Sequence, residues 1–187
     1  TMELKPDALQ LGFLKILHGT EMEQYAKKNG WTWMEQPPYE TLSTPYLPYK
    51  DILHLKDIET LVDAYWNSGA FSKTIAYIGR TAGFWNFFSG MAEYARRTGV
   101  FSAPRREQFW FEFLAHILSG ADGETAAILT NRAGKMHSDV AKELLRFDFI
   151  SAGKKGGFPP WYTHIYSKDA HRSALEQNGG IRNARLD

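Results

Sequence analysis

The apolar residues at the start of the chain lie on both sides of an extended segment. Leu9, Leu11, Phe13 and Leu17 alternate onto one side, and the other side of residues 9–17 is nearly as apolar. This pattern is typical of a strand buried on both faces, as in a parallel sheet that helices cover. Only eight residues precede it, so the strands with which it would pair are not evident in the sequence.

A short helix and an extended segment are expected next. Thr20 can cap a helix, Glu23 would complete a capping box three positions later, and Asn29 followed by Gly30 is a usual helix end. Residues 31–51 then combine aromatic and β-branched side chains with four prolines. Because proline prevents regular helix and the other side chains favour extended backbone, we expect a loose hairpin or an extended crossing there.

From Lys50 onward the apolar residues recur every three or four positions, which is the period of amphipathic helices. The predicted helices cover residues 50–66, 71–98 with kinks at Gly79 and Gly83, 102–118, a segment after Asp122 that breaks near Gly134, and 138–147. A short strand at 163–166 and a short helix at 169–177 are also expected. The predicted fold is mainly α, an irregular bundle of about five or six helices with a short N-terminal strand and a proline-rich extended or hairpin segment.

Composition and charge exclude several classes of protein. No apolar run could span a bilayer and the N-terminus lacks the pattern of a secretory signal, so we expect a soluble, cytoplasmic protein with no membrane partner. Cysteine is absent, which removes disulfides, thiolate nucleophiles and iron–sulfur ligation. The 22 basic and 21 acidic residues nearly balance, which makes nucleic acid an unlikely partner. The basic residues that such binding would use are Arg96, Arg97, Arg105, Arg106, Lys154 and Lys155.

The histidines and the glycine-rich loop do not form a recognisable catalytic pattern. None of the six histidines belongs to the i, i+4 pair of a helical zinc site, so no metal ligands are predicted. The sequence AGKKGGF at residues 152–158 lacks the GxxxxGK(S/T) pattern of a phosphate-binding loop and is interpreted as a basic loop. The carboxylates of residues 50–66 lie on the polar side of their helix and form no acid–base pair. Spacing alone therefore predicts no catalytic and no cofactor-binding residue.

Two aromatic clusters could line a substrate pocket. They are FWNFF at residues 84–88 and FWFEF at residues 109–113. Aromatic residues at helical spacing usually pack in a core, but clusters wider than one stripe also suit the wall of a cavity. The candidate pocket-lining residues are Trp85, Phe88, Trp110 and Phe113.

Three segments resemble one group of enzymes. LGFLKILHGTEMEQYAKKNGW resembles the last strand, turn and following helix of a radical SAM barrel, where Gly19 and Thr20 match the common pattern and His18 and Glu21 depart from it. PPYETLSTPYLPYKDILHLKDIETLVDAYWNSGAF and LLRFDFISAGKKGGFPPW resemble the C-terminal extension of cobalamin-binding radical SAM proteins. These are related to the anaerobic magnesium-protoporphyrin IX monomethyl ester oxidative cyclase family. The likeness covers most of residues 9–161.

The resemblance implies that residues 1–30 are the terminal strand and helix of a truncated barrel and that residues 31–187 are a helical C-terminal cap domain. The parent enzyme would use a 4Fe–4S cluster, S-adenosylmethionine and cobalamin, all held by domains that precede this chain. Those N-terminal cobalamin and radical SAM domains would be its partners. Without cysteine the chain could not hold the cluster, so it should not be active alone.

A second interpretation remains open at this point. The chain could be a helical protein–protein interaction or dimerisation module with no enzymatic role, which would use an exposed apolar patch to bind a partner or a second copy.

Overall fold

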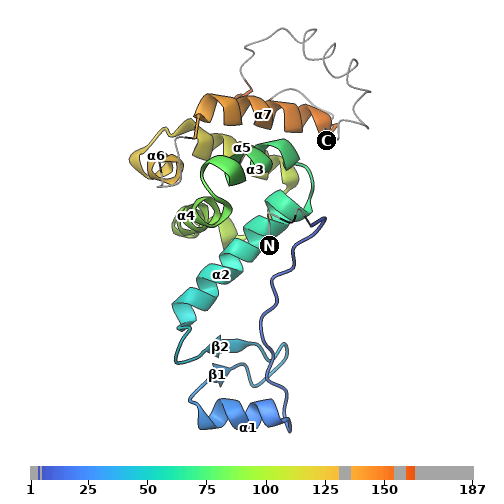
Figure 1. Ribbon diagram of the computed structural model, residues 1–187, viewed down its shortest axis with the longest axis vertical. Coiled ribbons are helices and arrows are strands. Elements are labelled where there is room, and N and C mark those ends of the chain that lie inside the picture. The colour runs from blue at the N-terminus through green and yellow to red at the C-terminus, as the bar shows by residue number, and fades with distance from the viewer. Residues whose placement is uncertain (1–3, 5, 131–135, 154–158, 163–187) are drawn as a thin grey trace.

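The computed structural model describes residues 4, 6–130, 136–153 and 159–162. The chain forms an elongated molecule with two lobes (Figure 1). Residues 12–48, which we call the hairpin lobe, lie at one end, and the helices of the helical lobe, residues 58–162, gather at the other. Helix α2, Tyr49–Val62, runs from one lobe to the other. Residues 6–17, which we call the N-terminal segment, run beside it. The mainly helical fold class is confirmed.

The helix of the hairpin lobe is α1, Glu21–Lys28, and its ends agree with the sequence signals. The Thr20 side chain accepts a hydrogen bond from the Glu23 backbone N–H at 3.2 Å, and the helix ends at Asn29. The second half of the capping box differs, because the Glu23 carboxylate accepts from the Gly19 N–H instead. Its hydrogen bonds from Lys27 and from Gly19 lower the pKa of Glu23 from 4.5 to about 2.

Strands β1, Thr32–Trp33, and β2, Thr41–Ser43, form the expected hairpin as an antiparallel pair. The N-terminal segment pairs with the other edge of β2. The Thr41 N–H donates to the Leu14 carbonyl at 2.9 Å, and the Ile16 N–H donates to the Tyr39 carbonyl at 2.8 Å. The expected short N-terminal strand therefore reduces to one bridge, at Lys15 opposite Glu40.

The burial predicted for this segment is wrong in part. Ile16 is fully buried, but Leu14 is 49% and Leu17 50% exposed. The reason is that only α2 and the small hairpin lie against the segment, so the chain described here covers one of its faces.

The predicted helix over residues 50–66 is α2 followed by a π-helical turn, Asp63–Asn67. The predicted helix over 71–98 is two helices, α3, Ser72–Thr81, and α4, Phe84–Arg97. The chain breaks at Gly83, which has φ +78°, a conformation that favours glycine. Gly79 does not kink the chain, but it leaves room for the Phe84 ring, which a Cβ at position 79 would overlap.

The remaining helices are α5, Glu107–Ser119, α6, Gly123–Leu129, and α7, Ser138–Ser151. Helix α5 begins later than the predicted residue 102, because residues 100–102 form a 3-10 turn. The Arg105 guanidinium donates to the Val100 carbonyl at 2.9 Å and fixes the loop between them. The predicted break near Gly134, strand 163–166 and helix 169–177 lie outside the described residues.

The main core lies in the helical lobe and is rich in aromatic rings. Tyr65 is at its centre, where its ring contacts Phe71, Phe88 and Trp110 and its hydroxyl donates to the Trp110 carbonyl at 2.9 Å. Burial raises the pKa of Tyr65 well above its usual value, so the hydroxyl stays protonated.

A buried carboxylate joins the last helix to α3. The Asp148 side chain, on α7, accepts hydrogen bonds from the Lys73 and Thr74 backbone N–H groups and from the Thr74 hydroxyl, at 3.2, 2.8 and 2.7 Å. It therefore caps the N-terminus of α3, whose own N-cap residue, Phe71, has no side chain that could do so.

In the described part of the chain, no helix has the length and apolar character to cross a membrane.

Candidate functional site

The π-helical turn at the end of α2 fastens the N-terminal segment to the helical lobe. The Asn67 side chain accepts a hydrogen bond from the Leu9 N–H at 2.8 Å and donates to the Leu9 carbonyl at 3.0 Å. The Trp66 indole N–H donates to the Pro6 carbonyl at 3.0 Å. The Asn67 amide thus satisfies both backbone groups of Leu9, as a neighbouring strand would. Asp63 accepts from the same amide at 2.6 Å and so orients it.

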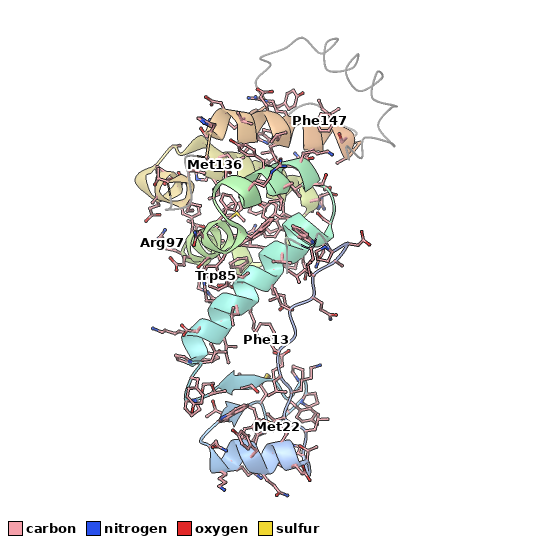
Figure 2. The ribbon with its side chains drawn as sticks, viewed as in Figure 1. Phe13, Met22, Trp85, Arg97, Met136 and Phe147 are labelled. Atoms are coloured by element: carbon pink, nitrogen blue, oxygen red, sulfur yellow. The ribbon has the colours of Figure 1, made fainter. Side chains whose placement is uncertain are left out.

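A second contact holds the segment lower down. Lys56, in the middle of α2, forms an ion pair with Glu40 of the hairpin loop. The Lys56 ammonium also lies 4.3 Å from the centre of the Phe13 ring, close enough for a cation–π interaction. The segment is therefore fixed at two points, at Asn67 and Trp66 after α2 and at Lys56 within α2. Figure 2 shows Phe13 between α2 and the hairpin lobe.

The hairpin lobe has very little core of its own. Only two of its apolar side chains, Ile16 and Ala26, are buried, and neither belongs to the main core. Five large apolar side chains of the lobe are exposed: Leu14, Leu17, Tyr25, Tyr46 and Leu47. A unit of this size with so small a core cannot be stable by itself. Its stability has to come from the contacts with α2 and from whatever covers these side chains.

The free edge of the N-terminal segment is also exposed. In the antiparallel bridge to Glu40, the bonded groups belong to Leu14 and Ile16, so the N–H and C=O of Lys15 point away from β2. Among the described residues they have no backbone partner. The segment therefore presents an unpaired strand edge next to an apolar face, the combination by which another strand can be added.

The structure does not bring the four candidate pocket residues together as one wall. Phe88, Trp110 and Phe113 are buried in the main core, with exposures of 1%, 9% and 7%. Trp85 is 60% exposed on α4. Trp110 and Phe113 contact each other edge to face at 6.3 Å between ring centres. Their role as a substrate wall stays a prediction.

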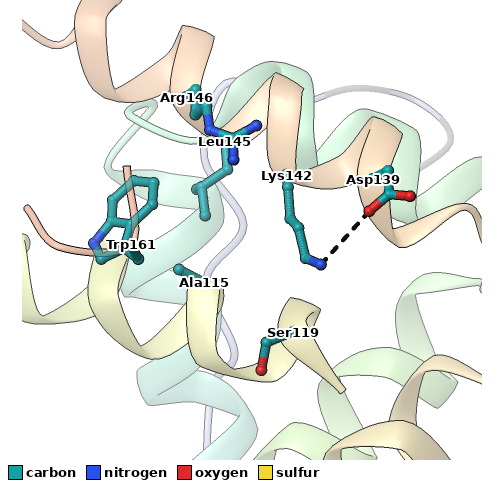
Figure 3. Close-up of a pocket in the computed structure, with 7 residues that line it drawn as sticks. All are labelled: Ala115, Ser119, Asp139, Lys142, Leu145, Arg146 and Trp161. Atoms are coloured by element: carbon teal, nitrogen blue, oxygen red, sulfur yellow. Dashed lines mark ion pairs between the residues drawn. The ribbon is translucent and has the colours of Figure 1, made fainter. Parts of the chain in front are cut away.

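A hollow of about 400 Å³ lies elsewhere, between α5 and α7. Its described lining includes none of the four aromatic candidates (Figure 3). The lining residues are Ala115, Ser119, Asp139, Lys142, Leu145, Arg146 and Trp161. No sequence motif marks this hollow, because its walls come from two helices and a loop that are separate in the chain.

Two of the described histidines, His54 and His116, bond to hydroxyl groups of neighbouring helices. His54 bonds to the Ser89 hydroxyl at 2.8 Å and joins α2 to α4. His116 bonds to the Tyr94 hydroxyl at 2.7 Å and lies 3.7 Å from the Asp122 carboxylate. Burial and the nearby acidic groups raise the pKa of Tyr94, so its hydroxyl stays protonated. No group of three or more potential metal ligands occurs in the described ranges.

Three of the six basic residues considered for nucleic acid, Arg96, Arg97 and Arg105, bind protein groups. Arg96 forms a two-pronged ion pair with the buried Asp57, and Arg97 pairs with Glu124 at 2.6 Å. Lys154 and Lys155 lie outside the described residues. Arg106 is exposed at the start of α5, and nucleic-acid binding is neither supported nor opposed by these contacts.

Residue spacing alone does not single out Asn67 or Asp148. Asn67 stands in the Tyr-x-Asn-Ser-Gly stretch and Asp148 in the Leu-Leu-x-Phe-Asp stretch that carry the resemblance. Their contacts lie 58 and 74 or more residues away, so only the fold shows what these side chains do.

Comparison with known proteins gives one family. The family model described as "Protein of unknown function (DUF4080)" matches residues 27–184. No curated protein and no solved structure matches.

Proposed function

Because this chain belongs to the DUF4080 family of proteins of unknown function, which is found in cobalamin-binding radical SAM proteins, we propose that it is the helical C-terminal cap of such an enzyme. The enzyme would be related to the anaerobic magnesium-protoporphyrin IX monomethyl ester oxidative cyclases. The cap would close the mouth of the barrel and could contribute to the wall of the substrate site.

The fastening of the N-terminal segment supports this proposal most directly. The N-terminal segment has an unpaired strand edge and an exposed leucine face. Asn67 fixes the direction of this segment through hydrogen bonds with the Leu9 backbone. Such a segment can be continuous with a sheet of another domain, because that sheet would supply the missing edge partner and cover Leu14 and Leu17. The contacts of Asn67 and Trp66 with the segment would then set the angle between that sheet and the helical lobe.

The described residues of this chain do not suit a 4Fe–4S cluster or a corrinoid. There is no cysteine to bind a 4Fe–4S cluster. The hollow of about 400 Å³ is too small for a corrinoid, and the described ranges hold no group of metal ligands. The cluster, S-adenosylmethionine and cobalamin would therefore be bound by the preceding domains, and this chain would have no activity without them.

The test uses the longer protein of which this chain would be the C-terminal part. It is purified without oxygen and reconstituted with iron, sulfide and cobalamin. We expect the visible absorption of both cofactors and, with dithionite, conversion of S-adenosylmethionine to 5′-deoxyadenosine. If a reconstituted, folded protein binds neither cofactor and forms no 5′-deoxyadenosine, the proposal is wrong. In that case light scattering would decide whether the chain is instead a dimerisation module, since the same apolar face could bind a second copy.

The role of the apolar face can be tested separately in the same protein. Leu17→Asp places a charge on the face that we expect the barrel to cover, and should reduce 5′-deoxyadenosine formation by about tenfold or more because burying an unpaired carboxylate is costly. Val140→Asp is the matched control, since Val140 is 45% exposed on α7. Equal activity of the two variants would show that this face is not an interface within the enzyme.

A further inference from the structure

The hollow between α5 and α7 has an apolar floor and a charged rim. Ala115 of α5, Leu145 of α7 and the Trp161 indole form the apolar part. The indole is fixed by an edge-to-face contact with Phe149, with 5.5 Å between the ring centres. Ser119, Asp139, Lys142 and Arg146 provide the polar groups. A few polar groups around an apolar hollow of about 400 Å³ are what small-molecule sites in proteins have in common.

Two cations of α7 face this hollow. Lys142 and Arg146 are four residues apart and thus lie on the same side of the helix. Like charges at this spacing repel each other and destabilise a helix slightly. The Arg146 side chain is only 6% exposed and forms an ion pair with Glu143, so its charge is held in the wall.

Lys142 is the cation that remains accessible. Its partner is Asp139, 3.6 Å away, and the Asp139 side chain is 91% exposed. A pair of this kind, with one partner in water, has almost no net stability. An anion that entered the hollow could therefore replace Asp139 at the Lys142 ammonium with little loss, and it would also reduce the repulsion between Lys142 and Arg146.

We propose that this hollow binds a small organic anion with an apolar ring or short chain. The apolar part would lie against Ala115, Leu145 and Trp161, and the anionic group would bind Lys142 beside Arg146. The ligand class follows from both halves of the site. A neutral apolar molecule would leave the Lys142 ammonium with only the exposed Asp139 as its partner. An inorganic anion would leave the apolar floor in contact with water. This inference does not depend on the proposed cap function.

Two naphthalene compounds that differ mainly in charge test the proposal on the full-length protein. The probes are 2-naphthoate and 2-naphthalenemethanol, each titrated by isothermal calorimetry at low salt. We expect 2-naphthoate to bind and the alcohol to bind at least about fivefold more weakly, because a charge-assisted hydrogen bond is stronger than a neutral one. Added salt should weaken binding of the anion more than binding of the alcohol.

Four variants locate the binding site. Lys142→Gln should weaken binding of 2-naphthoate by about fivefold and leave the alcohol unchanged, because only the anion uses the ammonium. Lys50→Gln is the control, since Lys50 is an exposed residue at the start of α2. Ala115→Leu should abolish binding of both probes by filling the floor. If that variant does not fold, Ser119→Phe fills the hollow from an exposed position.

The proposal is overturned if the folded protein binds neither probe at millimolar concentration. It is also overturned if both probes bind equally, or if Lys142→Gln and Lys50→Gln weaken 2-naphthoate to the same extent. None of these results depends on whether S-adenosylmethionine is cleaved, so they are independent of the test of the cap.

Discussion

The cap that Asp148 provides to α3 can be tested by removing its acceptor atoms. Asp148→Ala leaves the Lys73 N–H, the Thr74 N–H and the Thr74 hydroxyl without their acceptor. Asp148 is 3% exposed and Thr74 fully buried, so water cannot easily replace the carboxylate. Asp148→Asn keeps one acceptor oxygen for Thr74 but turns an amide donor toward the Lys73 N–H.

The expected magnitude follows from these contacts. Loss of a helix cap costs about 1 kcal/mol, and each buried donor left without a partner costs about 1–3 kcal/mol. Because the donors at Thr74 are adjacent and their costs overlap, we expect Asp148→Ala to lower the free energy of unfolding by about 3–4 kcal/mol. For a chain of this length that corresponds to a fall in Tm of about 10 °C. Asp148→Asn should cost about 1 kcal/mol.

Urea denaturation followed by circular dichroism measures both variants. Asp139→Ala is the control on the same helix, and we expect it within about 0.5 kcal/mol of the wild type because its side chain is exposed. If Asp148→Ala is as stable as that control, the carboxylate does not cap α3. If Asp148→Asn costs as much as Asp148→Ala, the charge rather than the acceptor geometry is what stabilises the contact.

The pH dependence gives an independent check on the same residue. Burial raises the pKa of Asp148 above its ordinary value of 3.8, against the opposing effect of its hydrogen bonds from Thr74. The folded state therefore holds the proton more tightly than the unfolded state. Stability of the wild type relative to Asp148→Asn should fall as the pH rises from 3.8 through the folded pKa, and level off above it. A relative stability that rises over this range would contradict the reasoning.

Three further predictions concern other contacts. Arg96→Ala should cost about 3 kcal/mol because it leaves Asp57 charged and buried, whereas Asp57→Ala should cost clearly less because Arg96 is half exposed to water; equal costs in urea denaturation would contradict this. Gly79→Ala should lower Tm through overlap with the ring packed against it, despite the better helix propensity of alanine, whereas Gly12→Ala, with no atoms near its added carbon, should not. The Glu23 carboxylate should titrate near pH 2 in carbon-13 NMR, and its contribution to stability should be present above the ordinary pKa of 4.5 and be lost as the pH falls toward 2; a midpoint near 4.5 would rule out the hydrogen bonds of its folded form.

The helices were predictable where a local signal specified them. The apolar period gave α2, and a glycine after the last periodic residue gave the end of α5 at Gly120, which is left-handed. The break at Gly83 was predicted only as a kink, because a sequence pattern cannot distinguish a kink within one helix from a break between two helices. The fold class followed from these local signals.

The long-range contacts were not predictable in the same way. Nothing in the neighbourhood of Asp148 distinguishes a buried cap from a surface carboxylate, since the donors belong to residues 73 and 74. The exposure of Leu14 likewise depends on which elements lie against the segment and not on its own pattern. The hollow requires the relative position of α5 and α7, so its lining residues could not be grouped from the sequence.

The π-helical turn, Asp63–Asn67, makes the length of this stretch matter more than most of its side chains. A turn of this kind holds one residue more than the α-helix would need. The extra residue is absorbed within the turn, so the chain after it keeps its direction. Asp63 and Asn67, at the two ends of the turn, form the hydrogen bond that orients the Asn67 amide toward Leu9. Among natural relatives, we therefore expect loops to vary in length and this turn to keep its number of residues, because deleting one residue between Asp63 and Asn67 would change this spacing.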